Sequence, residues 1–481
     1  MVGVVGSSPI APTTILLRSL FKSLFPQRGD AGQWLAQAKD LRSKGELRTA
    51  LAAYRKALAV GGPSAQIELQ LGVLHASLGE RDRAEAHLRR AMAQAPQDPD
   101  APCMLGTVMH DQRRFDEAAR LFEQALALRP DFAEAHFNLG LARFERADFR
   151  GAAASFARCA ALNRGEPWSD ARRAEPAREP APRFAPADMG VNEVKLRHDC
   201  EQLEYLLGVG RLPPAYREVL EDYRALLGEV RGKVDIGGLI PFDEARHRLV
   251  AGTYKRPINI DYTPPPAGPL VNPELDWGAI EERYHASEPN LVAVDNLLTP
   301  GALAALRRFC LESTFWNNIK PGYLGAYFYD GFCSELLLRA ARELREHMPA
   351  VMGGQPLQMM WGYKCESRLP GLGVHADEAA VNVNFWITGD EANLDPEHGG
   401  LLVYRQDAPS DWGFAKFNTD SAIIQSYLES DGEPPVRVPY RANRAVIFDS
   451  DLFHATDRPV FREGYANRRV NVTFLYGQRA Q

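Results

Sequence analysis

The chain lacks paired cysteines, a basic surplus and a long apolar run. Its six cysteines are scattered over 481 residues and none of them forms a CxxC pair. A disulfide framework is therefore not expected, and reduced thiols indicate a cytoplasmic protein. The net charge of −6 disfavours a nucleic-acid partner bound through phosphate contacts. Because no apolar run reaches the ~20 residues that span a bilayer, no membrane span is expected.

Several common motifs are absent as well. The sequence holds no GxSxG, P-loop or dinucleotide-binding fingerprint, which disfavours the corresponding hydrolase and nucleotide-binding classes. What is present is an ordinary globular composition, with 45% hydrophobic and 25% charged residues, in a chain long enough for about two to four domains. Residues 1–30 lack the basic start of a signal peptide. We interpret them as a disordered leader or as residues upstream of the true start.

A period of 34 residues dominates the N-terminal third of the chain. Small residues recur with this spacing at Ala50, Ala84, Ala118 and Ala152. Four residues after each comes a large apolar side chain, at Tyr54, Leu88, Phe122 and Phe156. Leu-Gly pairs recur in the same phase, at 71–72, 105–106 and 139–140. Such a repeat predicts helix pairs that stack on one another, with small residues where helices approach and bulky ones in the gaps.

This pattern resembles the tetratricopeptide repeat (TPR), in four units over residues 31–166. The first unit departs from the family, with Ala38 where glycine is usual, and the last has Arg164 in place of its closing proline. Terminal repeats are often atypical. The resemblance implies an α-solenoid whose concave surface binds a protein or peptide partner. The alternative is that the repeats mediate self-association or space the domains.

The composition changes after the repeats. Residues 167–190 are rich in Pro, Ala and charged residues, which predicts an extended linker. Residues 191–285 are expected to be a helical and irregular connector, to which the sequence assigns no role. Helical apolar spacing in this connector predicts two helices, over 191–209 and 214–231.

The last domain is expected over residues 286–481. Thr299 followed by Pro300 is a helix start signal, and a second helix is predicted over 334–348. Short apolar runs between turn residues then predict a strand-rich sandwich or barrel. The predicted strands cover 357–367, 380–388, 399–404, 444–449 and 469–477.

Two of the predicted strands have one apolar and one polar face, because side chains alternate with period two. The polar face of the 380–388 strand carries Asn382, Asn384, Trp386 and Thr388. The polar face of the 469–477 strand carries Arg469, Asn471 and Thr473. These faces either meet solvent or line a cavity, and alternation alone favours solvent.

His375, Asp377 and His454 form a candidate metal site. His375 and Asp377 are two residues apart on an extended segment, so their side chains point the same way. Two imidazoles and one carboxylate on one face suit Fe(II) and leave positions open for a co-substrate and oxygen. A lone HxD triplet usually lies on the surface by chance and binds no metal. The distant His454, together with an arginine at the start of the last strand, makes the combination specific and favours the cavity.

Together these residues resemble the double-stranded β-helix Fe(II)/2-oxoglutarate oxygenase superfamily. The resemblance covers about 290–481 and lies in the segments GVHADEAAVNVNFWIT, ANLDPEHGGLLVY, NRAVIFDSDLFHAT and GYANRRVNVTFLYG. It implies a jelly roll with supporting helices, the iron triad, 2-oxoglutarate and O2 as co-substrates, and an arginine for the far carboxylate of 2-oxoglutarate. The expected fold class is multidomain α + β, with a TPR α-solenoid before the jelly roll.

Arg468 and Arg469 compete for the role of this arginine. A guanidinium binds a carboxylate through a bidentate fork. Strand phase favours Arg469, because it shares a face with Asn471 and Thr473 whereas Arg468 shares one with valines. Additional hydrogen bonds to the co-substrate are expected from Tyr363, Asn384 and Thr388, although Tyr363 equally suits a core position.

The resemblance implies a 2-oxoglutarate-dependent dioxygenase. The fusion of repeats to an oxygenase is reminiscent of animal prolyl and aspartyl/asparaginyl hydroxylases, so a protein or peptide side chain recruited by the repeats is the expected substrate. One alternative is a small-molecule oxygenase whose repeats serve assembly. Another is a non-catalytic TPR scaffold, against which the intact triad argues. The sequence leaves the oligomeric state open.

Overall fold

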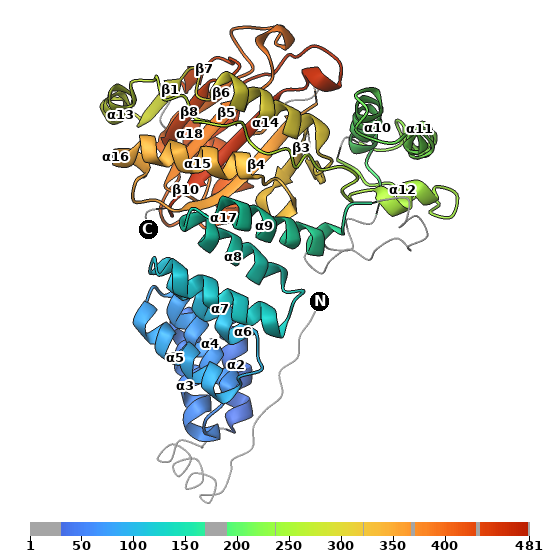
Figure 1. The fold of residues 1–481 in the computed structure, drawn as a ribbon. Coiled ribbons are helices and arrows are strands. Elements are labelled where there is room, and N and C mark those ends of the chain that lie inside the picture. Colours follow the sequence, from blue (N-terminus) through green and yellow to red (C-terminus); the bar gives the residue numbers. More distant parts are fainter. Residues whose placement is uncertain are drawn as a thin grey trace, which may run out of the picture. The chain divides into compact units, whose positions relative to one another are not determined.

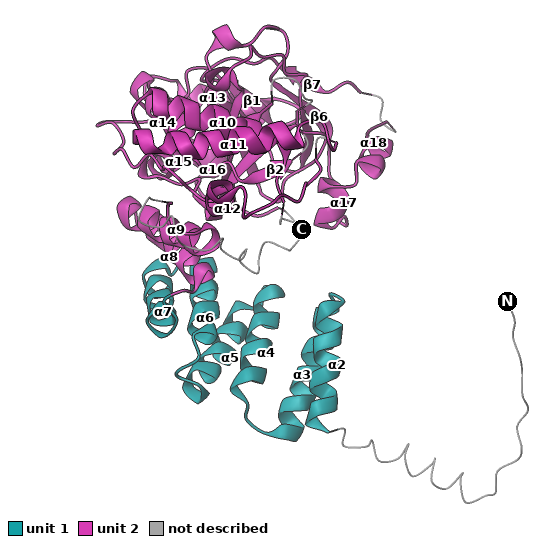
Figure 2. Cartoon of the chain, turned by 90° about the vertical axis from the view of Figure 1, so that its right-hand side faces the viewer, with its two compact units in different colours: residues 1–130 teal, residues 131–481 magenta. Residues whose placement is uncertain are grey.

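The computed structural model describes residues 30–168, 190–235, 237–320, 322–366, 371–429 and 433–479. The predicted leader and most of the predicted 167–190 linker lie outside these residues. The chain forms two compact units, residues 1–130 and 131–481 (Figure 2). No helix in the described residues is both long and apolar enough to cross a bilayer.

The first unit consists of three helix pairs. Its helices are α2 (Ala31–Ser43), α3 (Leu47–Gly61), α4 (Ala65–Ser77), α5 (Arg81–Gln94), α6 (Asp100–Asp111) and α7 (Phe115–Leu128). The small residues of the 34-residue period, Ala50, Ala84 and Ala118, are fully buried. The Leu-Gly pairs mark the closest approach of two helices, since a Cβ on Gly106 would lie 2.7 Å from the Phe122 ring.

Replacing Gly106 by alanine is expected to destabilise the first unit by about 1–3 kcal/mol, because the added methyl overpacks the contact with Phe122. Gly228 is the matched control. It lies exposed in helix α11 (Arg217–Val230) with no neighbouring atom within 4 Å of a built Cβ, so alanine there should stabilise its helix by about 0.5–1 kcal/mol. Urea unfolding measures both changes. A Gly106→Ala protein as stable as the wild type would contradict the close approach.

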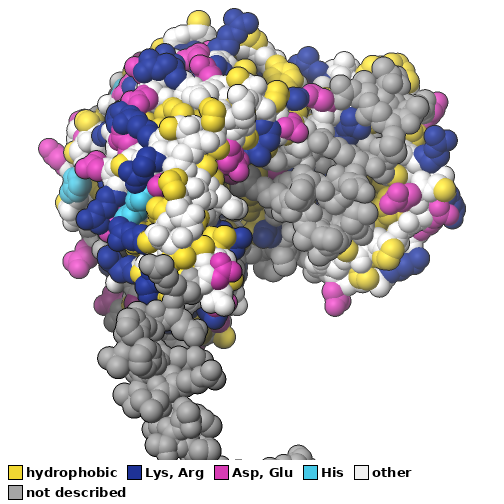
Figure 3. Space-filling model, turned by 90° about the horizontal axis from the view of Figure 1, so that it is seen from below, with side chains coloured by type: hydrophobic (Ala, Val, Ile, Leu, Met, Phe, Trp, Pro, Cys, Tyr) yellow, Lys and Arg dark blue, Asp and Glu magenta, His cyan; other side chains and the backbone are white. Residues whose placement is uncertain are grey.

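Ion pairs also link the helices of the first unit. Arg89 pairs with Glu85 and Glu117 at 2.5 and 3.2 Å, and Arg114 pairs with the same carboxylates at 2.9 and 2.5 Å. Lys and Arg side chains are likewise interspersed with Asp and Glu on the face of the molecule drawn in Figure 3. Exposed pairs contribute only about 0–1 kcal/mol each, so the buried packing accounts for most of the stability.

The second unit contains two antiparallel sheets. The larger has the strand order β1-β8-β5-β10-β4-β3-β2 and the smaller has the order β7-β6-β9. In the described part of the chain, no strand pairing closes them into a barrel. The strands are β1 (Leu291–Val294), β2 (Asn318–Lys320), β3 (Tyr323–Tyr327), β4 (Leu357–Cys365), β5 (Val381–Trp386), β6 (Leu401–Asp407), β7 (Val436–Val438), β8 (Ala445–Asp449), β9 (Leu452–Thr456) and β10 (Val470–Tyr476).

Helices cover one face of the larger sheet (Figure 1). Leu306 of α14 (Pro300–Glu312) and Leu344 of α15 (Glu335–His347) share one core with Phe385 of β5. The other face of the sheet packs against the smaller sheet, where Trp386 and Val403 belong to a common cluster. The apolar face predicted for residues 380–388 therefore lies under the helices. The sheet-bearing part also contains α13 (Trp277–Ala286), α16 (Pro349–Met352), α17 (Phe414–Asn418) and α18 (Ser421–Glu429).

The fourth predicted repeat packs into the second unit. It consists of α8 (Ala133–Glu145) and α9 (Phe149–Arg164). The Phe156 ring lies 4.1 Å from that of Phe328, which begins the short helix η4 (Phe328–Asp330) directly after β3. Two buried ion pairs complete this contact: Arg164–Asp330 at 3.1 Å and Arg345–Glu145 at 2.8 Å. The predicted boundary at residue 166 therefore cuts through a packed core.

The predicted connector also has a core of its own. Its first two predicted helices correspond to α10 (Glu193–Gly208) and to η3 (Pro214–Tyr216) followed by α11. A short helix, α12 (Arg248–Thr253), packs against α11. Their buried apolar side chains, including Leu206, Tyr223 and Val250, form a separate cluster. We refer to residues 190–258 as the α10–α12 module.

Candidate metal centre

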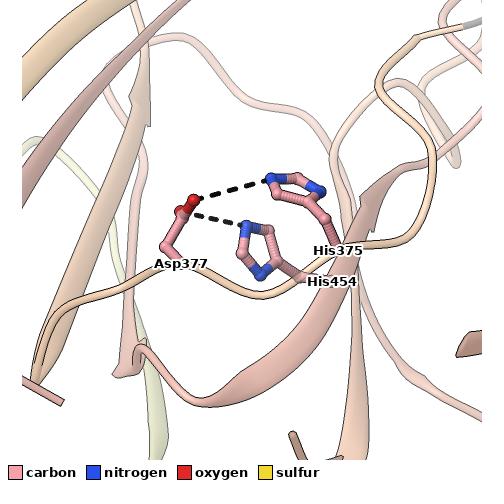
Figure 4. A group of neighbouring side chains, drawn as sticks. All are labelled: His375, Asp377 and His454. Atoms are coloured by element: carbon pink, nitrogen blue, oxygen red, sulfur yellow. Dashed lines mark ion pairs between the residues drawn. The ribbon is translucent and has the colours of Figure 1, made fainter. Parts of the chain in front are cut away.

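His375, Asp377 and His454 converge in the second unit. The ligand atoms of all three lie within 4.8 Å of one another. Nε2 of His375 is 3.8 Å from Oδ1 of Asp377, and Nε2 of His454 is 3.5 Å from Oδ2 (Figure 4). All three residues are buried, at 3–7% exposure. The three side chains predicted to share an ion therefore do lie around one point.

Backbone hydrogen bonds hold the two histidines in place. His375 and His454 form an isolated antiparallel bridge, in which each backbone N–H donates to the other's carbonyl at 3.1 and 2.8 Å. Nδ1 of His375 lies 2.9 Å from the Gly373 carbonyl and Nδ1 of His454 lies 3.0 Å from the Leu452 carbonyl. Because a carbonyl only accepts, both Nδ1 atoms carry the proton. Both Nε2 lone pairs are then free to bind a metal.

The pKa shifts of His375 and Asp377 favour the protonation states that bind a metal. Burial, reinforced by repulsion from His454, lowers the pKa of His375 to about 4, so its ring is neutral at pH 7. Burial raises the pKa of Asp377, but interactions with both histidines and a hydrogen bond from Asn382 outweigh it and hold the pKa below its usual value. The centre thus offers the neutral imidazole of His375 and the carboxylate of Asp377 as metal ligands.

A row of amides extends from Asp377 across the sheet. Nδ2 of Asn382 donates to Oδ2 of Asp377 at 2.7 Å, and Asn384 donates in turn to Asn382. Nδ2 of Asn471 then donates to Oδ1 of Asn384 at 2.7 Å. Because the carboxylate only accepts, it fixes the orientation of each amide in the row. Oδ1 of Asn471 is left without a hydrogen-bond partner among the described residues.

A pocket lies beside the three ligands. The pocket is also lined by polar side chains of β5 and of residues 469–473, and by aromatic side chains of β3 and β4. The polar faces predicted to line a cavity therefore do so in part. These lining residues are Tyr323, Trp361, Tyr363, Asn384, Arg469, Asn471 and Thr473.

The two neighbouring arginines point in opposite directions. Arg469 lines the pocket, where Nε donates to the Gly399 carbonyl at 2.7 Å and a terminal nitrogen donates to Gly400 at 3.2 Å. Arg468 is equally buried but is absent from the pocket wall and forms ion pairs with Glu201 and Glu366. The strand-phase argument therefore predicts correctly which of the two arginines lines the pocket.

Two of the other three predicted co-substrate ligands lie in the pocket. Tyr363 and Asn384 line it, but Thr388 does not. Thr388 lies two residues beyond the end of β5 at Trp386. Its hydroxyl accepts from the Val470 N–H at 3.0 Å and donates to the Arg468 carbonyl at 2.8 Å. The structure therefore places Thr388 outside the pocket wall, with its hydroxyl bound to the backbone.

Sequence reasoning missed two aromatic residues of the pocket. Trp361 precedes Tyr363 by two residues on β4, so strand alternation was a usable signal for it. Tyr323 lies on β3, which was not predicted because the glycine-containing run from Pro321 to Gly331 gives no clear alternation. Tyr323 is 6% exposed and its ring lies 4.6 Å from that of Tyr363.

Comparison with known proteins identifies the repeats. Residues 35–99 and 103–167 match the tetratricopeptide repeat family model. These residues are tetratricopeptide repeats. The second match runs through α8 and α9, so the helix pair that packs into the second unit belongs to the repeat family. The TPR assignment is thereby confirmed for about a quarter of the chain.

Several solved structures show some likeness to part of this chain. The crystal structure of MamA is 24% identical, covers 30% of this chain and 83% of its own, and has a TM-score of 0.27. YrrB, described as a TPR protein with an unusual peptide-binding site, is 25% identical over 29% of this chain and 72% of its own, with a TM-score of 0.26. A mutant Thermobaculum terrenum O-GlcNAc transferase is 25% identical over 28% and 26% of the two chains, with a TM-score of 0.27. No curated protein matches this chain.

Proposed function

We propose that the second unit is an Fe(II)/2-oxoglutarate-dependent dioxygenase with the two sheets of a double-stranded β-helix. The observation that carries the proposal is the convergence of His375, Asp377 and His454 in a pocket that also presents Arg469. A two-histidine, one-carboxylate set with open positions is the donor arrangement of non-haem Fe(II) oxygenases. The TPR helices make a surface on which such an enzyme recruits a protein or peptide substrate.

The donor set of Arg469 supports 2-oxoglutarate as the ligand. Arginine has five N–H donors. One points to the Gly399 carbonyl, one to Gly400 and one to Sγ of Cys365 at 3.7 Å. These contacts involve Nε and one hydrogen of each terminal nitrogen. The remaining two N–H groups are the pair that a bidentate carboxylate contact requires.

In this proposal the protein positions the metal and the co-substrate and keeps water away from them. Bound Fe(II) with 2-oxoglutarate and O2 supplies the oxidation of a C–H bond, with succinate and carbon dioxide as co-products. His375, Asp377 and His454 hold the metal through the atoms that converge. Arg469 orients the far carboxylate of the co-substrate. The rings of Tyr323, Trp361 and Tyr363 shield the reacting centre from solvent.

Anaerobic titration with Fe(II) and then 2-oxoglutarate, followed by a succinate assay against fractionated lysate, tests the proposal. We expect one Fe(II) and one 2-oxoglutarate per chain, and succinate formation once O2 is admitted. Absence of 2-oxoglutarate binding would leave the non-catalytic TPR scaffold as the function.

Replacing Arg469 by lysine is expected to raise the Kd for 2-oxoglutarate by about tenfold to a hundredfold, because a point charge replaces the bidentate fork. Arg437→Lys is the control, since Arg437 is half exposed and pairs with Asp457. Isothermal titration calorimetry under anaerobic conditions measures both. Equal affinity in the two variants would remove Arg469 from the co-substrate site.

A further inference from the structure

The α10–α12 module meets the sheet-bearing part of the second unit largely through polar contacts. Gln202 of α10 donates to the carbonyls of Leu311 and Ser313 at 3.1 and 2.9 Å. Arg211 pairs with Glu312 at 2.6 Å. Apolar side chains of the module form its own core, and the Tyr205 ring of α10 lies 5.3 Å from that of Tyr465. Polar contacts of this kind give positional specificity more than bulk stability.

One of these contacts reaches the start of β10. Glu201 of α10 approaches Arg468 at 3.0 Å from Nε and 2.9 Å from a terminal nitrogen. The other terminal nitrogen of Arg468 donates to Glu366, just after β4, at 2.8 Å. The side chains of Arg468 and Glu366 are 5% and 7% exposed, and that of Glu201 is 31% exposed. Arg468 is thus held between two carboxylates that come from separate elements.

Arg468 is covalently joined to the arginine of the pocket. The backbone on both sides of this link is fixed: the Arg468 carbonyl accepts from Thr388, and the Arg469 carbonyl accepts from the Cys365 N–H at 2.9 Å. The side chains of these two adjacent residues leave the backbone just before β10 in opposite directions, Arg468 to Glu201 and Arg469 to the Gly399 carbonyl. The ion pairs of Arg468 therefore help to set where the Arg469 guanidinium lies. A bidentate contact tolerates little displacement, and an error of about 1 Å is costly.

We propose that the α10–α12 module positions Arg469 through the ion pairs of Arg468 with Glu201 and Glu366, and thereby sets the affinity of the pocket for a dicarboxylate co-substrate. Glu201 and Glu366 are positioning residues, since neither lines the pocket. The inference rests on the proposed function and gives the connector a role within it. The module is then part of the co-substrate site, and not only a spacer between the repeats and the sheets.

Glu201→Asp tests the inference, because it keeps the charge and withdraws the carboxylate by one methylene. Glu204→Asp is the matched control on the same helix. Its side chain is 65% exposed and pairs with Arg224 at the surface. The measurement is calorimetric binding of Mn(II), and then of 2-oxoglutarate, to the full chain without O2. We expect Glu201→Asp to raise the Kd for 2-oxoglutarate by about fivefold to tenfold, with Mn(II) affinity unchanged, and Glu204→Asp to change neither.

The outcomes separate the inference from the proposed function. If the wild-type chain binds Mn(II) but not 2-oxoglutarate, the proposed function fails and the inference fails with it. If the wild type binds 2-oxoglutarate and Glu201→Asp binds it equally well, the inference alone is overturned. A lower melting temperature with an unchanged Kd likewise shows a purely structural ion pair. Glu201→Gln is the second variant: a raised Kd there supports the positioning role, whereas a lowered Kd shows that charge, and not position, is what Glu201 contributes.

Discussion

Replacing Asp377 by alanine is expected to reduce 2-oxoglutarate turnover by about a thousandfold or more. Loss of a residue that only supports a metal ligand typically costs about 10–100-fold, and Asp377 is the single carboxylate among the three converging side chains. Without it, the buried site would have to accept a dication between two imidazoles. Succinate formation, measured by NMR against the wild type, gives the effect.

Asp395→Ala is the control for this variant. Asp395 pairs with His398 at 2.9 Å, its side chain is 40% exposed, and it does not line the pocket. We expect its turnover to equal that of the wild type. Metal titration of both variants distinguishes loss of the ion from loss of the fold. If Asp377→Ala formed succinate at the wild-type rate, the three residues would not be the metal centre.

Local periodicity accounts for much of what the sequence predicted correctly. The 34-residue period gave the repeats, because small and large residues must alternate wherever helices approach closely. Period-two alternation predicted β5 and β10 with the correct face under the helices, and it separated Arg469 from Arg468. Both signals depend only on neighbours along the chain. They remain valid as long as the element itself continues.

Other features of the site were not predictable from local periodicity. Thr388 follows the end of β5 at Trp386, and its hydroxyl contacts the backbone of Arg468 and Val470 instead of lining the pocket. Tyr323 was missed because its short strand follows a turn and contains a glycine at Gly325. The pairing of Glu201 with Arg468 joins residues 267 positions apart. Such contacts arise from tertiary packing and leave no periodic trace in the sequence.

The packing of α8 and α9 changes how the repeats should be removed. The family pattern and the packing disagree over α8 and α9: their sequence continues the TPR period, but their side chains lie in the core of the second unit. Phe144 and Phe156 belong to the same cluster as Phe328 and Leu337. A chain starting at residue 131 keeps this core, whereas one starting at residue 167 loses it.

Deletion of residues 31–166 is therefore expected to unfold the second unit, and deletion of 31–130 to leave it folded. Loss of a buried Phe side chain costs about 3–5 kcal/mol, and the longer deletion removes two. It also leaves buried Asp330 and Arg345 without their partners, at about 3–5 kcal/mol each. The sum is comparable to the whole stability of about 5–15 kcal/mol that a domain has. Thermal melting by circular dichroism compares the two deletions, and equal melting temperatures would contradict the shared core.

The shorter deletion also decides what the repeats are for. If the first unit recruits a peptide, the chain lacking 31–130 should bind Fe(II) and 2-oxoglutarate normally but lose its response to the protein fraction that stimulates succinate formation. If the substrate is a small molecule, the stimulation should survive the deletion. The longer deletion cannot make this distinction, because it would remove activity under either hypothesis by destroying the core that supports the pocket.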